Sequence, residues 1–325
     1  MPAVSIIIVT WNSAAHLPRC FAALAAQTFS DFEIVIVDNG STDGGVEVLP
    51  GRFPSLSFQV QRNETNLGFA PANNTGARLA QAPWLALLNA DAFPEPDWLE
   101  RLLAAAQEYP GFLSFASRQI QDRDPGRFDG EGDAYHVSGM AWRRNYNAPV
   151  APGGTPTPVF SACAAAALYH RETFLQAGGF DEDYFSYFED VDLGFRLLLV
   201  GIRTLYVPGA VVRHVGSAST GRRSAFAVHY GLRNLIWTFY KDMPPTLLWR
   251  YLPAHLFQVT ALFTTYVLRG SGGPALRALW EAALGLPAAL RKRASIQAGR
   301  SVDWHTLRAA MTRGLLEPMQ EYLRR

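Results

Sequence analysis

The chain has 325 residues, of which 49% are apolar and 18% are charged, and its net charge is +1. Such a composition can bury a large core, which argues against a disordered chain. The charge is unevenly distributed, because residues 1–221 carry 14 Lys/Arg against 23 Asp/Glu, whereas residues 222–325 carry 15 against 5. We therefore expect an acidic globular domain over residues 1–221, followed by a basic region over residues 222–325 that meets an anionic surface.

The cysteines and the N-terminus indicate a cytoplasmic protein. Only Cys20 and Cys163 occur, each within an apolar stretch, so we expect no disulfide framework and a reducing compartment. The first residues lack the basic region of a signal peptide and enter a strand directly, so no targeting segment is expected.

The N-terminal half alternates strands and helices. Apolar runs of strand length lie at 4–9, 33–37, 56–60 and 84–88. Helical patterns lie at 14–27, 70–80 and 96–108. This alternation predicts an α/β fold with a mainly parallel sheet covered by helices on both faces.

The middle of the chain changes character at residues 121–160, which are crowded with Gly, Pro and Asp. We interpret this stretch as a long loop region, and long loops of this kind are often lids or binding segments. Regular patterns return with an apolar segment at 161–170, a helix at 187–200, and short strands at 203–207 and 211–215.

From residue 224 onward the pattern is helical. Five apolar residues share one helix face, namely Val228, Leu232, Leu235, Ile236 and Phe239. The transmembrane candidate, 247–268, is interrupted by polar residues and keeps only ten continuous apolar or neutral residues, 259–268, where roughly 20 are needed. A helix that lies in the membrane interface, on an anionic surface, explains this pattern better than a helix that spans the bilayer. A helical bundle packed on the N-terminal domain is the alternative.

Polar residues follow several predicted strands. Ligands collect at the carboxyl ends of parallel strands, so these residues are candidates for binding. They are Thr10 and Asn12 after the first strand, Asp38, Asn39 and Asp43 after the second, and Asn89 and Asp91 after the run 84–88. The turn after the first strand is not glycine-rich, which argues against a dinucleotide site and hydride transfer.

Asp38 and the segment 66–74 are candidates for binding a nucleotide. A carboxylate at a strand end can accept bonds from a uracil or thymine N–H or from a ribose hydroxyl, whereas Asp43 equally fits a turn or helix cap. Asn66, Gly68 and Asn73 lie around a predicted helix N-terminus, where close backbone approach and the helix dipole suit a diphosphate.

Asp91 and His214 are candidate metal ligands. Asp91 ends the apolar run 84–88, and a divalent cation, Mg²⁺ or Mn²⁺, held together with substrate phosphates would neutralise it. A turn-forming role is the alternative. His214 ends another strand and could complete the site, although a lone histidine is often structural.

The densest acidic cluster is Glu189-Asp190-Val191-Asp192 at a predicted helix start. Carboxylates in a first turn commonly complement the helix dipole. Here aromatic residues crowd the cluster, and an enclosed carboxylate beside other carboxylates has a raised proton affinity that suits a general base near neutral pH.

Five segments, taken together, resemble family 2 glycosyltransferases of the rhamnosyltransferase-like branch. They are residues 4–12, 37–43, 66–70, 88–91 and 188–193, and the resemblance spans about residues 3–240. It implies a GT-A domain with a helical C-terminal extension. It also implies nucleotide binding by Thr10, Asn12, Asp38, Asn39, Asp43, Asn66, Gly68, Asn73 and Asn89.

By the same resemblance, Asp91 and His214 match the metal-binding positions, and Asp190, next to Glu189, matches the catalytic base. Asn89 stands where many members have an aspartate. The implied reaction is inverting transfer of rhamnose or another deoxyhexose from a dTDP- or UDP-linked donor to a lipid-linked or polysaccharide acceptor in cell-envelope glycan synthesis, with Mg²⁺ or Mn²⁺ stabilising the leaving diphosphate.

The expected location is the inner face of the cell membrane, bound peripherally through an anionic membrane surface, and no nucleic acid is expected among the partners. A catalytically inactive nucleotide-sugar-binding scaffold is the alternative function. A nucleotidyltransferase is disfavoured, because it would show a basic glycine-rich loop near the N-terminus, and the first 30 residues hold only Arg19 as a basic group besides histidine.

Overall fold

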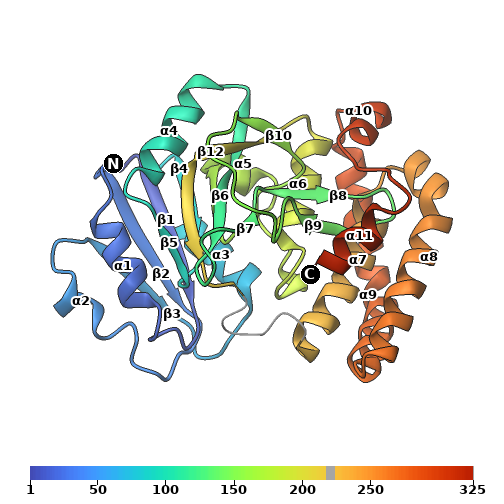
Figure 1. Ribbon diagram of the computed structural model, residues 1–325, viewed down its shortest axis with the longest axis horizontal. Helices are drawn as coiled ribbons and strands as arrows, with labels where there is room; N and C mark the ends of the chain where they lie inside the picture. The colour runs from blue at the N-terminus through green and yellow to red at the C-terminus, as the bar shows by residue number, and fades with distance from the viewer. Residues whose placement is uncertain (217–223, 325) are drawn as a thin grey trace.

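A computed structural model describes residues 1–216 and 224–324 (Figure 1). The predicted boundary between residues 221 and 222 lies outside the described residues. One large sheet has the strand order β10 (Thr157–Val159), β12 (Arg203–His214), β6 (Phe112–Gln121), β11 (Ala166–His170), β4 (Trp84–Leu88), β1 (Val4–Thr10), β2 (Phe32–Asp38) and β3 (Phe58–Arg62). Strands β3, β2, β1 and β4 are parallel, β12 is parallel to β6, and β11 runs antiparallel between β4 and β6. The prediction of a mainly parallel α/β sheet is confirmed.

Helices cover both faces of this sheet. On one face α1 (Leu17–Ala25) and α4 (Trp98–Glu108) pack against a core that includes Ile6 and Ile8 of β1. On the other face α3 (Phe69–Leu79) and α6 (Glu189–Leu199) share a core with Ile7. Because both faces of β1 are buried, its sequence is a continuous apolar run rather than an alternating one.

The prediction of a loop over residues 121–160 is wrong. Within it lie the short strands β7 (Phe128–Gly130), β8 (Asp133–Tyr135), β9 (Ala141–Arg143) and β10, and residues 128–142 are all buried. Gly132 and Gly139 have φ of +73° and +90°, so the glycines mark turns between three-residue strands that are too short to show a periodic pattern. The two strands predicted at 203–207 and 211–215 are one strand, β12, with a register shift between Val207 and Val211.

The remaining short elements are helices and one strand, which pairs antiparallel with β12. They are α2 (Leu49–Arg52), β5 (Ala92–Pro94), α5 (Arg171–Gln176) and the 3-10 helix η1 (Glu182–Tyr184).

The C-terminal region is helical and packs on the sheet domain (Figure 1). Its helices are α7 (Ala225–Asp242), α8 (Pro245–Leu268), α9 (Gly272–Ala298), α10 (Trp304–Ala309) and α11 (Glu317–Arg324). The predicted apolar face of α7 is buried, and Val228, Leu232 and Leu235 share a core with Met140 and Trp142. Among the described helices, none combines the length and the apolar character that crossing a bilayer requires.

Buried charges also connect this region to α6. Asp192 on α6 pairs with Lys241 on α7 and with Arg196, and Lys241 pairs in addition with Asp181. Burial opposes ionisation of Asp192, but Arg196 and Lys241 hold the pKa of its carboxyl well below the usual range. Removing one partner of such a buried group costs roughly 3–5 kcal/mol, so this network fixes α6 against α7.

Candidate active site

Five of the predicted site residues line one cleft of about 830 Å³ at the carboxyl ends of β4 and β12. They are Asn89, Asp91, Glu189, Asp190 and His214. Strand pairing brings the two predicted metal ligands together, because β5 pairs antiparallel with β12 and sets Ala92 opposite His214. Asp91 and Asp190, which are about a hundred residues apart in the chain, therefore face a common space.

Asp91, His214 and Asp129 form a buried chain of hydrogen bonds. The Nε2 atom of His214 lies 3.3 Å from Oδ1 of Asp91, and Nδ1 lies 2.7 Å from Oδ2 of Asp129. Although burial lowers it, these two carboxylates raise the pKa of His214 to about 9. The bond to Asp129 fixes the ring with Nε2 directed at Asp91, in the way that a carboxylate bonded to the other ring nitrogen orients a metal-binding histidine.

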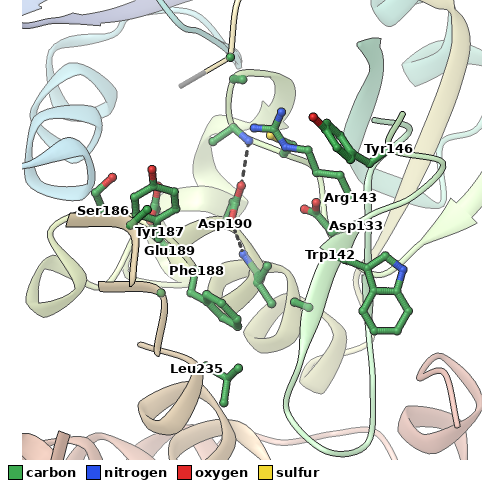
Figure 2. A pocket seen from close by; sticks show the side chains of 18 of the residues that line it. Asp133, Trp142, Arg143, Tyr146, Ser186, Tyr187, Phe188, Glu189, Asp190 and Leu235 are labelled. Atoms are coloured by element: carbon green, nitrogen blue, oxygen red, sulfur yellow. Dashed lines mark hydrogen bonds between the residues drawn. The ribbon is translucent and has the colours of Figure 1, made fainter. Parts of the chain in front are cut away.

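Asp190 is held by two backbone amides. Its Oδ2 accepts from the amide of Ala164 at 3.2 Å and its Oδ1 from the amide of Val191 at 2.8 Å (Figure 2). Ala164 reaches this edge of the sheet because it precedes β11, which runs opposite to its neighbours. Burial raises the pKa of Asp190, and burial together with Asp190 raises that of Glu189 further. A higher proton affinity suits a carboxylate that must accept a proton near neutral pH.

Three charged residues of the site were missed by the sequence interpretation. Asp129, Asp133 and Arg143 line the same cleft, and the β8–β9 pairing sets Asp133 opposite Arg143, beside Asp190 (Figure 2). Arg143 forms an ion pair with Asp129. All three lie in the stretch interpreted as a loop. The signal for the two aspartates was the acidic run 129–133, which holds three carboxylates, whereas Arg143 lies outside it.

The predicted nucleotide-binding residues after β1 and β2 do not line this cleft. Their side chains connect the loop after β1 with the loop after β2. Oδ1 of Asn12 accepts from the amide of Thr42 at 2.9 Å, and Oδ2 of Asp43 accepts from the amide of Ala14 at 2.7 Å. Asp38 accepts from the amide of Ser41 at 3.0 Å, and its other oxygen pairs with Arg62 at 3.0 Å. Thr10 is buried, and its Oγ1 has no hydrogen-bond partner among the described residues. Nucleotide binding by these four residues stays a prediction.

The amides at the N-terminus of α3 are engaged by the chain itself. Phe69 and Ala70 donate to the carbonyl of Phe185 at 2.6 and 3.3 Å, and a Cβ on Gly68, whose φ is +100°, would lie 2.7 Å from Phe185. The glycine therefore permits close packing of the segment that leads to Asp190.

Neighbouring amides support this turn. Asn39 donates to the carbonyl of Gly68 at 3.0 Å and to Oδ1 of Asn66 at 3.2 Å, and Asn73 donates to the carbonyl of Phe69 at 2.9 Å. These contacts position the turn, and a direct role of Asn39, Asn66, Gly68 and Asn73 at a nucleotide stays a prediction.

A divalent cation fits the residues at Asp91 and His214. Among the described residues no group of three or more His, Cys, Asp or Glu side chains could hold a metal by itself. Mg²⁺ and Mn²⁺ commonly bind through one or two protein ligands, with substrate phosphates and water completing the shell. Asp91, His214 and the supporting Asp129 match that requirement.

The sequence matches the model of the family described as glycosyl transferase family 2 over residues 5–176. The chain belongs to this family, and it is a glycosyltransferase.

Curated relatives point to related chemistry. One is the N-acetylglucosaminyl-diphospho-decaprenol L-rhamnosyltransferase of Mycobacterium tuberculosis, 32% identical over 252 residues, which cover 69% of this chain and 80% of that protein. Another is the validoxylamine A glucosyltransferase of Streptomyces hygroscopicus subsp. jinggangensis, 31% identical over 223 residues, which cover 62% of this chain and 53% of that protein. The chain is thus similar to rhamnosyltransferases, as its motifs indicated.

Solved structures confirm the GT-A fold. The mannosyltransferase PcManGT from Pyrobaculum calidifontis, in complex with GDP-Man and Mn²⁺, matches with a TM-score of 0.56 and 20% identity, covering 99% of this chain and 86% of that chain. S. aureus TarS in complex with UDP-GlcNAc matches with a TM-score of 0.58 and 17% identity, covering 95% and 90%.

Proposed function

We propose that this chain catalyses inverting transfer of a deoxyhexose, with rhamnose as the first candidate, to a polyprenyl-diphosphate-linked glycan in cell-envelope synthesis. The donor is a dTDP- or UDP-linked sugar. The observation that carries the proposal is the single cleft shared by Asp190 and the Asp91–His214 pair. The similarity to a rhamnosyltransferase whose name gives a GlcNAc-diphospho-decaprenol acceptor supports the choice of substrates.

In the proposed reaction Asp190 accepts the proton of an acceptor hydroxyl as that oxygen attacks the anomeric carbon and the nucleoside diphosphate leaves. One displacement on the face opposite the leaving group inverts the configuration. The amides of Ala164 and Val191 hold the carboxylate in place, so the base is oriented before the acceptor arrives. Asp91 and His214 would hold Mg²⁺ or Mn²⁺, which supplies positive charge to the leaving diphosphate.

A transfer assay tests this function. The full chain is incubated with dTDP-rhamnose or UDP-GlcNAc, with Mn²⁺ or Mg²⁺, and with N-acetylglucosaminyl-diphospho-decaprenol in detergent, and nucleoside diphosphate release and the product anomer are measured. We expect acceptor-dependent release and an inverted linkage with dTDP-rhamnose, and transfer from UDP-GlcNAc alone would contradict the choice of a deoxyhexose. Donor binding without any acceptor-dependent release would favour the inactive scaffold instead, and a retained configuration would refute the mechanism.

We also propose that the protein acts at the inner face of the cell membrane as a peripheral protein. Support comes from the excess of basic residues after residue 221 and from large apolar side chains exposed on α8 and α9, such as Trp249, Phe257 and Trp280. Apolar surface bordered by basic groups is the pattern of helices that bind anionic bilayers. Sedimentation with phosphatidylglycerol vesicles tests this, and the absence of binding at low ionic strength would refute it.

A further inference from the structure

The cleft has two chemically different ends. One end holds the carboxylates and His214 at the edge of the sheet. The other is formed by α7 and α8, where Val228, Leu232, Leu235 and Leu262 line it. Arg269, at the C-terminal end of α8, is the basic residue of this side. In Figure 2 Leu235 lies on the far side of Phe188 from Asp190. An amphiphilic ligand with a polar sugar and an apolar chain matches this division better than a sugar nucleotide alone.

An exposed apolar surface covers the outer sides of α8 and α9. Its large side chains are Trp249, Leu256, Phe257, Val267 and Leu268 on α8, and Leu276, Trp280, Leu284 and Leu290 on α9. We call these nine residues the outer apolar face. No Asp, Glu, Lys or Arg occurs over residues 251–268 of α8. Their helical spacing puts these side chains on one side of each helix, and exposed apolar side chains gathered in this way mark a surface that contacts lipid or another protein.

The cleft and the outer apolar face meet at the turn between α8 and α9. Tyr266, Arg269 and Ser271 line the cleft. Their neighbours Leu268 and Leu276 are 82% and 62% exposed. A chain that leaves the apolar end of the cleft at this turn therefore reaches the outer apolar face directly.

The charges of α8 and α9 favour an anionic lipid as the occupant. Between residues 245 and 298 the sequence holds six Lys or Arg residues and one acidic residue, Glu281. That glutamate is already paired with Arg277 and His229. Lys292 pairs with Asp181 and Asp183 from outside this range, so six basic residues still exceed three acidic ones. A second copy of this chain would bring the same excess of positive charge against itself, whereas a phosphorylated lipid surface would complement it.

We infer that the turn between α8 and α9 is the entry site for a lipid-diphosphate acceptor. The hydrocarbon chain passes over Leu268 and Leu276 and lies between α7 and α8, Arg269 at the rim contacts the diphosphate, and the sugar reaches Asp190. The inference rests on the proposed function and specifies its acceptor class and route.

The test compares two acceptors that share a head group. Transfer is measured to N-acetylglucosaminyl-diphospho-decaprenol in phosphatidylglycerol/phosphatidylcholine vesicles and to water-soluble N-acetylglucosaminyl-diphospho-hexanol. The double variant Leu268→Asp, Leu276→Asp should lower transfer to the decaprenol acceptor at least about tenfold and leave transfer to the hexanol acceptor unchanged. Leu290→Asp is the matched control, since it places a charge on the same face about 20 Å along α9 from Leu276, and it should leave both rates near those of the unaltered chain.

Arg269→Gln tests the diphosphate contact. It should raise KM about tenfold for both acceptors and leave donor KM unchanged, because the head group is common to both. An unchanged acceptor KM would remove Arg269 from the site.

The other outcomes separate the entry site from its rivals. An equal loss with Leu290→Asp would overturn a localised entry site in favour of general membrane docking. If the double variant lowered the transfer rate equally for both acceptors, or for neither, the proposed path of the hydrocarbon chain over Leu268 and Leu276 would be overturned. A dimer abolished by the double variant while both rates persist would assign the face to a second copy. If the unaltered chain used neither acceptor, the proposed function would fail and the inference with it.

Discussion

Asp129→Asn should weaken metal binding without removing a metal ligand. The rise in the pKa of His214 from its ordinary 6.5 to about 9 corresponds to a preference for the charged ring of roughly 3 kcal/mol. The contact to Asp129 at 2.7 Å is the shorter of its two carboxylate contacts. Because the same carboxylate orients the ring and strengthens it as a ligand, its loss should lower Mn²⁺ affinity about 10–100-fold, or roughly 1.4–2.7 kcal/mol.

Calorimetric titration of Mn²⁺ into the protein with a nucleoside diphosphate present measures this affinity directly. Asp133→Asn is the matched control, since it removes one carboxylate charge from the same cleft at a residue whose Oδ2 accepts from the hydroxyl of Ser161 at 2.9 Å. Unchanged affinity in Asp129→Asn would refute the reasoning. An equal loss in Asp133→Asn would show that overall charge, rather than orientation of His214, determines binding.

Three further variants probe the base, the metal pair and the link to the helices. Asp190→Asn should lower kcat about 10²–10⁴-fold with donor affinity preserved, and parallel loss of donor affinity would contradict a role as base. Asp91→Ala should weaken donor binding only when Mn²⁺ is present, so equal donor affinity with and without the ion in both proteins would contradict it. Lys241→Met should lower the free energy of unfolding by roughly 3–5 kcal/mol in urea at pH 7. The pKa of Asp192 is depressed below its ordinary 3.8 and that of Lys241 is raised above its ordinary 10.5, so the contribution of the pair is fully present between these two values. It declines as the pH falls below 3.8 toward the depressed pKa of Asp192, and as the pH rises above 10.5 toward the raised pKa of Lys241. The Lys241→Met penalty should therefore be smaller at about pH 3 than at pH 7, and an undiminished penalty at pH 3 would refute this assignment.

The sheet and part of its site could be predicted because the position at which a strand ends in the sequence indicates where its last residues lie in the fold. Parallel strands deliver their last residues to one edge, so Asp91 and His214 could be placed together although 123 positions separate them in the sequence. The density of carboxylates at one helix start singled out the cluster 189–192, and the resemblance to the family assigned the base to Asp190 within it. Each of these signals is local in the sequence.

The rest of the site depends on contacts that no local pattern reveals. Asp129 and Arg143 lie in strands of three residues, which are too short to show an alternating apolar and polar pattern. Their partners are distant in the chain. The N-terminus of α3 was expected to be open to a diphosphate, but the carbonyl of Phe185 accepts from its first amides. Phe185 has φ of +62°, a conformation that tertiary packing imposes against local preference.

The ion pair between Asp192 and Lys241 affects which acceptors can bring a hydroxyl to Asp190. Asp190 lies two residues before Asp192 on α6, and Lys241 belongs to the helix that packs against α8 and α9. Asp190, the proposed base, is thus joined to the outer apolar face through a buried ion pair and packed helices. If that face rests on a bilayer, Asp190 lies at a constant height above the lipid. The enzyme would then select acceptors by the length of the head group, because a head group one sugar longer would place its terminal hydroxyl beyond Asp190.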